Sequence, residues 1–355
     1  MNEFTVGSKG DPNKHSIIPA IFSPNSWKDH NLFDEIKDYR TDKIDYGRTF
    51  YWSPKNTGDT PSQLEIEAID RVYFKQLLEK YYSKVIIEIS TYSSKSEIKK
   101  RSSLNAKLDK FIIDLKSRNF TPRFYTTNYD RLLQTILSDK EEVFDGFDIK
   151  NTTERYDDAL LPNIRKIASD DKVLNYYNLH GSVYWAYEYF NEQYDYQFIC
   201  TPTLEHPYQE WNNYELTNPG QSSFISNIIT GYNKIQRLSL SPLNHMYQSF
   251  TSDLFNSDMI ICIGFSFSDP YINRLLKDAI KLKKMKVLNV TYAEHGYLDD
   301  QAWHKFGYEV LKRDNDFSTN NADANGWIHS SNSLQHIYTN GFEDFLLREA
   351  WNEIL

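Results

Sequence analysis

Residues 259–290 read MIICIGFSFSDPYINRLLKDAIKLKKMKVLNV, and this stretch decides the fold class. Its first five residues, MIICI, are apolar throughout, which is typical of a strand buried on both faces of a parallel sheet. The polar turn GFSFSDP leads into a helical pattern over 271–284, and a second apolar strand, KVLNV, follows at 286–290. A strand, a helix and a strand of these lengths form one βαβ unit. The sequence therefore predicts an α/β fold with a parallel sheet.

Two other apolar segments also end in polar turns. Residues 122–125 predict a short strand that runs into TTNYD (126–130) and then a helix, and residues 173–179 (VLNYYNL) predict a strand that runs into His180-Gly181-Ser182. The carboxyl ends of parallel strands meet at one edge of a sheet, where ligands bind. We therefore expect the three turns to face one ligand, although they are far apart in the chain.

Composition narrows the classes of protein to which this chain can belong. The chain has 355 residues, 40% of them hydrophobic and 25% charged, with a formal net charge of −9. The acidic balance argues against nucleic acid as the main ligand, because nucleic-acid binders present a basic face. No apolar run is long enough to span a membrane and the N-terminus does not resemble a signal peptide, so we expect a cytoplasmic protein.

The remaining segments predict packing elements and loops. Apolar residues at four-residue steps predict helices over 64–90 and 104–115. The polar stretch 315–335 predicts a loop, and a closing helix is expected near 341–354. Nothing in the sequence requires a domain boundary.

The three turns together resemble the SIR2-like superfamily, whose members consume NAD+ and are related to sirtuins. TTNYD is similar to the sirtuin TQNxD turn, LHGS (179–182) to its HG motif, and GFSFSDP to its GTS-type ribose-binding loop, in the same chain order. The resemblance covers roughly residues 110–295, and GFSFSDPYI has the form found in bacterial SIR2-like defence proteins. It implies a Rossmann-like parallel sheet flanked by helices, with a helical or irregular insertion lobe.

The resemblance also implies a domain organisation. We expect one SIR2-like domain over residues 1–355, with a helical insertion at about 26–117 and a second insertion at 186–235 in place of the sirtuin zinc ribbon. The zinc ribbon needs four cysteines, and this second insertion contains only Cys200. NAD+ is therefore expected as a substrate without a metal, and hydrolysis is favoured over protein deacylation.

The resemblance assigns roles to individual residues. Asn128 would hold the ribose or the attacking water, and His180 would act as the general base. Asp130 would shape the nicotinamide-ribose pocket, while Gly264 and Ser266 would lie on the adenosine side. The full set of positions matched to NAD+ binding is Thr127, Asp130, Gly181, Gly264, Ser266, Asp269, Gly7 and Gly10.

The family's first glycine turn is the weakest match. Its nearest candidate is Gly7-Ser8-Lys9-Gly10, in which Ser8 and Lys9 replace residues that let backbone amides approach a pyrophosphate. This departure leaves an alternative open, in which the protein is a catalytically inactive SIR2-like subunit that binds a nucleotide or holds a defence complex together.

For single residues, a purely structural role is the alternative to a role in function. Asn128 could be only a turn former, His180 only a structural histidine, and Asp269-Pro270 an ordinary helix start. The order of the three motifs favours function for the first two. The leading hypothesis is an NAD+ hydrolase in bacterial antiphage or abortive-infection defence. Because an unrestrained NAD+ hydrolase would kill its host, we expect a homo-oligomer or a partner protein, such as an ATPase or a nucleic-acid-sensing subunit.

Overall fold

The structure is a computed structural model. All the residues it describes from Ile89 onward fall within one compact unit. Both glycines of the candidate first turn, Gly7 and Gly10, lie outside the described residues, as does the predicted helix over 64–90 apart from its last two residues. The described residues are 89–90, 100, 102–138, 142–150, 159–169, 174–189, 196–200, 213–218, 221–229, 238–293, 306, 310 and 321–355.

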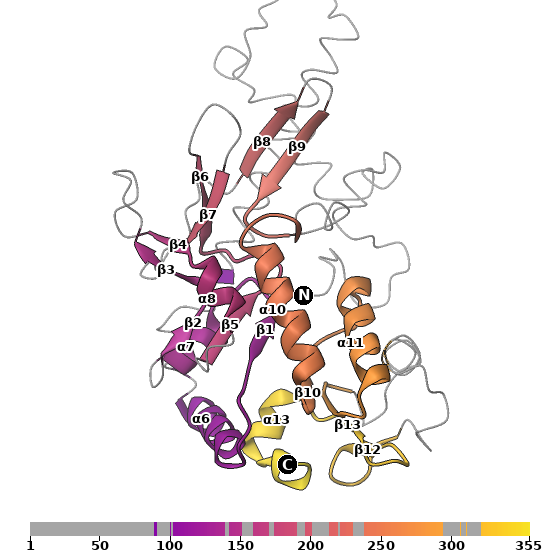
Figure 1. Cartoon of the computed structure of the whole chain (residues 1–355). Coiled ribbons are helices and arrows are strands. Elements are labelled where there is room, and N and C mark those ends of the chain that lie inside the picture. The colour runs from indigo at the N-terminus through magenta and orange to yellow at the C-terminus, as the bar shows by residue number, and fades with distance from the viewer. Residues whose placement is uncertain are drawn as a thin grey trace, which may run out of the picture. The chain divides into compact units, whose positions relative to one another are not determined.

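The predicted βαβ unit is present. Strand β10 (Met259–Ile263) leads through the GFSFSDP turn into helix α11 (Pro270–Leu282), and strand β11 (Lys286–Val290) pairs with β10 in parallel. Strand β13 (Gln335–Tyr338) extends this sheet in parallel and β12 (Trp327–His329) closes it antiparallel, in the order β10-β11-β13-β12. Figure 1 labels β10, β13 and β12 of this sheet. The α/β prediction is confirmed.

A second, three-stranded sheet carries the other two turns. Its strands are β1 (Phe124–Thr126), β5 (Leu174–Asn178) and β2 (Val143–Phe144), and both neighbouring pairs are parallel. Helix α7 (Leu132–Ser138) lies between β1 and β2 in the chain. A strand, a turn and a helix follow one another here as the sequence predicted.

Helices cover both faces of these sheets. In β11, Val287 belongs to the core that contains α11 and helices α8 (Ile164–Ala168) and α10 (Leu243–Asn256). The next residue, Leu288, belongs to the opposite core, because successive side chains of a strand point to opposite faces.

The opposite core contains helix α6 (Ser102–Ser117) and helix α13 (Gly341–Leu347). Residues of β1 and β10 pack against both cores: Tyr125 and Ile260 against the first, Phe124 and Met259 against the second. The two parallel sheets therefore share the same layers, which is the arrangement of a Rossmann-like fold.

Antiparallel strands that were not predicted from the sequence lie in the region of the second insertion and, earlier in the chain, between residues 147 and 162. Trp185, at the start of β6, is buried and packs against Phe147 and Phe198. The strands form a sheet in the order β3-β4-β7-β6 and a separate β8-β9 hairpin. Their bounds are β3 Phe147–Lys150, β4 Leu160–Pro162, β6 Trp185–Tyr189, β7 Tyr196–Cys200, β8 Asn213–Asn218 and β9 Gln221–Ser226.

The predicted loop over 315–335 was wrong in part, because β12 lies inside it. A strand of three residues shows too little alternation to be found from its own sequence, and pairing with β13 defines it. The closing helix is divided: α13 ends near Glu349, which has the left-handed φ of 55°, and the 3-10 helix η4 (Ala350–Glu353) follows.

Two histidines face each other across the β12–β13 pair. The Nδ1 atoms of His329 and His336 are 2.8 Å apart, and Nε2 of His336 lies 3.1 Å from the carbonyl oxygen of Ser333. A carbonyl oxygen can only accept, so His336 donates through Nε2 and its Nδ1 accepts from His329. Burial, and then the neighbouring His329, lower the pKa of His336 to about 4.

This lowered pKa predicts a loss of stability in acid. The unfolded chain takes up a proton near the ordinary value of 6.5, so the stability that neutral His336 contributes is present above pH 6.5 and is lost as the pH falls toward 4. Between pH 7.5 and pH 5 the loss should be about 2 kcal/mol. His336→Gln, whose amide keeps one donor and one acceptor, should remove about this much of the pH dependence in urea unfolding. Equal pH dependence in both proteins would contradict the assignment.

Candidate functional site

The three polar turns begin where β1, β5 and β10 end. The pairing of β1 with β5 continues past the strands, because the Leu179 N–H donates to the Thr126 carbonyl over 2.9 Å. On the other sheet, the Gly264 N–H donates to the Val290 carbonyl over 2.9 Å. The first and third turns thus each begin with a residue whose backbone is bonded to a neighbouring segment.

The first turn, TTNYD, is held by groups other than the Asn128 side chain. The Asn128 N–H donates to Oγ1 of Thr126 over 3.0 Å, and Nδ2 of Asn178 donates to the carbonyl oxygens of Asn128 and Asp130 over 3.0 and 3.3 Å. Asp130 is buried, and its Oδ1 accepts from the Leu132 N–H over 2.8 Å at the start of α7. Asp130 therefore binds the backbone at the start of α7.

The second turn, His180-Gly181-Ser182, is tied to the first turn and to residues 227–229. The Ser182 hydroxyl donates to the Tyr129 carbonyl over 3.1 Å, and the His180 carbonyl accepts from the Ile229 N–H over 2.7 Å. Gly181 has a φ of +82°, and a Cβ atom there would stand 2.0 Å from the Asn227 carbonyl oxygen. Only glycine fits this position.

The His180 side chain joins the second turn to the third. Its Nε2 lies 3.0 Å from Oδ2 of Asp269, and the two side chains are 12% and 7% exposed. The other carboxylate oxygen of Asp269 accepts from the N–H groups of Tyr271 and Ile272 and so caps α11, with Pro270 in the first turn. The helix start expected at Asp269-Pro270 is present, and the same carboxylate also binds the histidine.

The rest of the third turn is held in an unusual backbone conformation. Gly264 has a φ of +60° and Phe267 a φ of +53°, both in the left-handed region. The Phe267 carbonyl accepts from Nδ2 of Asn273, a buried residue of α11, over 2.6 Å. The Ser266 hydroxyl lies 2.7 Å from that of Ser268.

A cavity of about 430 Å³ lies between β1 and β10. Thr127 and Asn128 of the first turn line it, as do Gly264 and Phe265 of the third. In the described part of the chain, β1 and β10 are both edge strands of their sheets. The structure therefore brings together Asn128, Thr127 and Gly264 around one cavity of a volume suited to a small ligand. His180, Asp130, Gly181, Ser266 and Asp269 are not among its lining residues.

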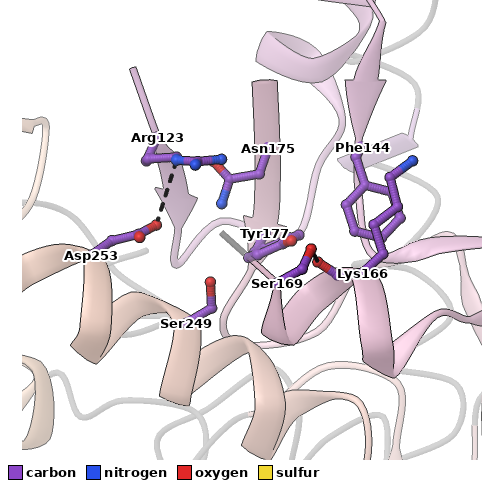
Figure 2. A pocket seen from close by; sticks show the side chains of 8 residues that line it. All are labelled: Arg123, Phe144, Lys166, Ser169, Asn175, Tyr177, Ser249 and Asp253. Atoms are coloured by element: carbon purple, nitrogen blue, oxygen red, sulfur yellow. Dashed lines mark hydrogen bonds and ion pairs between the residues drawn. The ribbon is translucent and has the colours of Figure 1, made fainter. Parts of the chain in front are cut away.

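A second pocket lies between the three-stranded sheet and helices α8 and α10 (Figure 2). Arg123 points across it toward Asp253 of α10, with Nε 3.9 Å from Oδ2, and Tyr177 of β5 forms part of the wall. Its volume is about 10 Å³, which is room for one water molecule. This pocket cannot hold a nucleotide. The cavity between β1 and β10 is the candidate site because residues of two of the three turns line it.

Comparison with known proteins supports the family resemblance of the three turns. The family model described as the SIR2-like domain matches residues 122–311, which is more than half of the chain and includes all three turns. The chain belongs to the SIR2-like family. Proteins of this family are generally NAD-dependent enzymes, so an NAD-related function follows for this SIR2-like protein. No curated protein matches the chain.

Metal-binding clusters and membrane-spanning helices are both absent from the described residues. No group of three or more His, Cys, Asp and Glu side chains in these ranges could hold a metal ion. Among the same residues, no helix is both long enough and apolar enough to cross a membrane. Both cysteines, Cys200 and Cys262, are buried and unpaired, and burial raises the pKa of each thiol to about 12.

Two parts of this SIR2-like site could not be predicted from the sequence. Asn178, the last residue of β5, is buried and holds the first turn through its side-chain amide. In the sequence, this role of Asn178 is signalled only by the position of a polar residue at the end of an apolar strand. The pairing of His180 with Asp269 was also missed, because the two residues are 89 positions apart and the Asp-Pro pair was explained by helix capping.

Substitution of Gly181 and of Gly264 should lower the free energy of unfolding by different amounts. Gly181→Ala should destabilise the protein by more than about 4 kcal/mol, because the new Cβ atom meets backbone that cannot move aside. Gly264→Ala should cost only about 1 to 2 kcal/mol for the left-handed backbone, since a Cβ atom there meets nothing within 4 Å. Urea unfolding of both variants measures the difference, and equal losses would show that packing does not set the cost at Gly181.

Proposed function

We propose that this SIR2-like protein is an NAD+ hydrolase, which cleaves the nicotinamide N-glycosidic bond to give nicotinamide and ADP-ribose or a cyclic product. The proposal rests on the environment of the Asn128 side chain. Its side chain is exposed on the cavity wall, and among the described residues its amide makes no hydrogen bond. Thr126 and Asn178 hold the turn, so the Asn128 amide is left for a ligand.

The chemistry of the reaction suits such an amide. Cleavage of the nicotinamide bond builds positive charge on the ribose, so the site must hold the sugar and direct a nucleophile at its anomeric carbon. A carboxamide supplies two donors and an acceptor for hydroxyl groups or for a water molecule. Because neighbours fix the turn, Asn128 is positioned before the substrate arrives, which lowers the entropic cost of binding and orientation.

His180 is the proposed general base. The family resemblance assigns this role to the histidine of the HG motif, and the bond to Asp269 holds its ring beside the third turn. His180 does not line the cavity, and the hydrogen bonds of a general base often shorten only when the substrate is bound. The expected place of Ser266 on the adenosine side of NAD+ belongs to the same proposal.

The proposed biological role is antiphage or abortive-infection defence. It rests on the form of the turn GFSFSDPYI, which resembles bacterial SIR2-like defence proteins. Loss of NAD+ would halt the infected cell and its virus together. Control by assembly into an oligomer, or by an ATPase or nucleic-acid-sensing partner, is part of this proposal.

The second candidate function is a catalytically inactive SIR2-like subunit that binds a nucleotide or holds a complex together. Ser8 and Lys9 in the candidate first glycine turn favour it, because a side chain at either position would obstruct close approach of backbone amides to a pyrophosphate. Absence of nicotinamide release from NAD+ by the purified protein, with and without candidate activators, would favour this second function.

Asn128→Asp separates a ligand-binding side chain from a turn former. Aspartate adopts the same turn conformations, so the melting temperature should stay within about 2 °C, in keeping with a surface change of about 0.5 kcal/mol or less. NAD+ turnover should fall by about 100-fold or more, because the amide donors are replaced by a negative charge beside the ribose hydroxyls and phosphates. Melting temperature and nicotinamide release are measured on the same preparation.

Asn178→Asp is the matched control. The same chemical change there removes the donor to two carbonyl groups and buries a charge, so it should cost about 3 kcal/mol or more of stability. If Asn128→Asp also lowers the melting temperature, Asn128 is structural. If it keeps both stability and turnover, the proposed contact with the substrate is wrong.

A further inference from the structure

One carboxylate, that of Asp269, makes two separate sets of contacts. Oδ1 accepts from the N–H groups of Tyr271 and Ile272 over 3.0 and 3.3 Å, while Oδ2 lies 3.0 Å from Nε2 of His180. The residue is 7% exposed, so water does not compete strongly for either oxygen. The cap and the histidine contact therefore use different oxygen atoms of one buried group.

Capping alone does not require the second contact. Asparagine and serine cap helices about as well as aspartate, and a cap uses only one side-chain oxygen. The negative charge and the second oxygen at Oδ2 are thus additional to what the start of α11 needs.

The contact with Oδ2 fixes where the histidine carries its proton. A carboxylate oxygen only accepts, so Nε2 of His180 must be the donor. In the neutral ring the lone pair then resides on Nδ1, which is the nitrogen able to take up a proton. The two backbone N–H donors and the positive end of the α11 dipole favour negative charge at Asp269, and so maintain it as the acceptor.

Tyr247 of α10 is a titratable group near this carboxylate. Burial, and then the charge of Asp269, raise the pKa of Tyr247 on α10, and Tyr271 and Tyr129 act on it in the same direction. Tyrosine hydroxyls are neutral near pH 7. Around the His180–Asp269 pair they therefore add no charge that would reverse the direction of its hydrogen bond.

We infer that Asp269 is a positioning residue for the proposed reaction: it holds His180 in the tautomer protonated at Nε2, so that Nδ1 is the proton acceptor, while it caps α11 with its other oxygen. The inference rests on the proposed function only for the role of His180 as the base. The tautomer and the double use of the carboxylate follow from the geometry of Asp269 itself.

Asp269→Asn tests the inference because it keeps the cap and reverses the contact with the histidine. The amide oxygen still accepts from the Tyr271 and Ile272 N–H groups, which turns the amide NH₂ toward Nε2 of His180. That nitrogen must then accept, and the proton moves to Nδ1. The kcat for NAD+ hydrolysis should fall by about 100-fold or more, as it does when the aspartate of a Ser-His-Asp triad is changed in this way. KM should change less than about threefold, since the residue does not line the cavity.

A structural role alone would give a different result. Asp269→Ser retains a preferred capping residue but is too short to reach the histidine, so it measures the stability of the helix start without the contact. Both variants should melt within about 3 °C of the wild type if capping is retained. Loss of turnover in proportion to loss of folded protein in both variants would overturn the positioning role.

The tautomer of His180 can be determined by NMR, without a measurement of NAD+ hydrolysis. In protein labelled with nitrogen-15 at its histidines, the ring resonances of His180, assigned by their loss in His180→Gln, should show the proton on Nε2 in the wild type and on Nδ1 in Asp269→Asn. The same tautomer in both proteins would overturn the inference, as would a changed tautomer with unchanged kcat. A wild type that releases no nicotinamide would sink the proposed function, and the resonance comparison would still decide the tautomer.

Discussion

The parallel pairing of β1 with β5 is the constraint on which the site depends. It continues beyond the strands through the bond from the Leu179 N–H to the Thr126 carbonyl, so the first two turns leave the sheet side by side. From there Asn178 and Ser182 bind the backbone of the first turn. A slip of this register by one residue would reverse the faces of β5 and remove the Asn178 amide from the turn that it holds.

The third turn reaches this pair of turns from a different sheet. Its link is the side-chain contact between His180 and Asp269, which is short and nearly buried. Asn128 stands in contrast, because neighbours hold its backbone while its side chain faces the cavity. The site thus separates groups that keep the turns in place from a group that is left to meet a ligand, which is the arrangement that preorganised sites require.

Features that depend on local sequence patterns could be predicted, and features that depend on pairing or on tertiary contacts could not. The strand at 259–263 and the helix after it were predictable because their apolar patterns and the Asp-Pro start are local. Strand β12 and the strands in the second insertion depend on pairing with another strand, and β12, with three residues, has no pattern of its own. For the site, the three motifs located the turns, but Asn178 and the partner of His180 could be found only in three dimensions, because tertiary contacts and not spacing along the chain define them.

Gly181 has a consequence for how related chains should be compared. Its lack of a side chain is enforced by the Asn227 carbonyl oxygen, a packing contact that involves no substrate. A descendant that had lost all activity would still need glycine there in order to fold, whereas nothing in that packing would preserve the ring of His180. Of the two letters in the HG motif, the glycine is thus a marker of shared ancestry and the histidine a marker of retained chemistry. Counting the motif as one signal would overstate how many members of such a family remain enzymes.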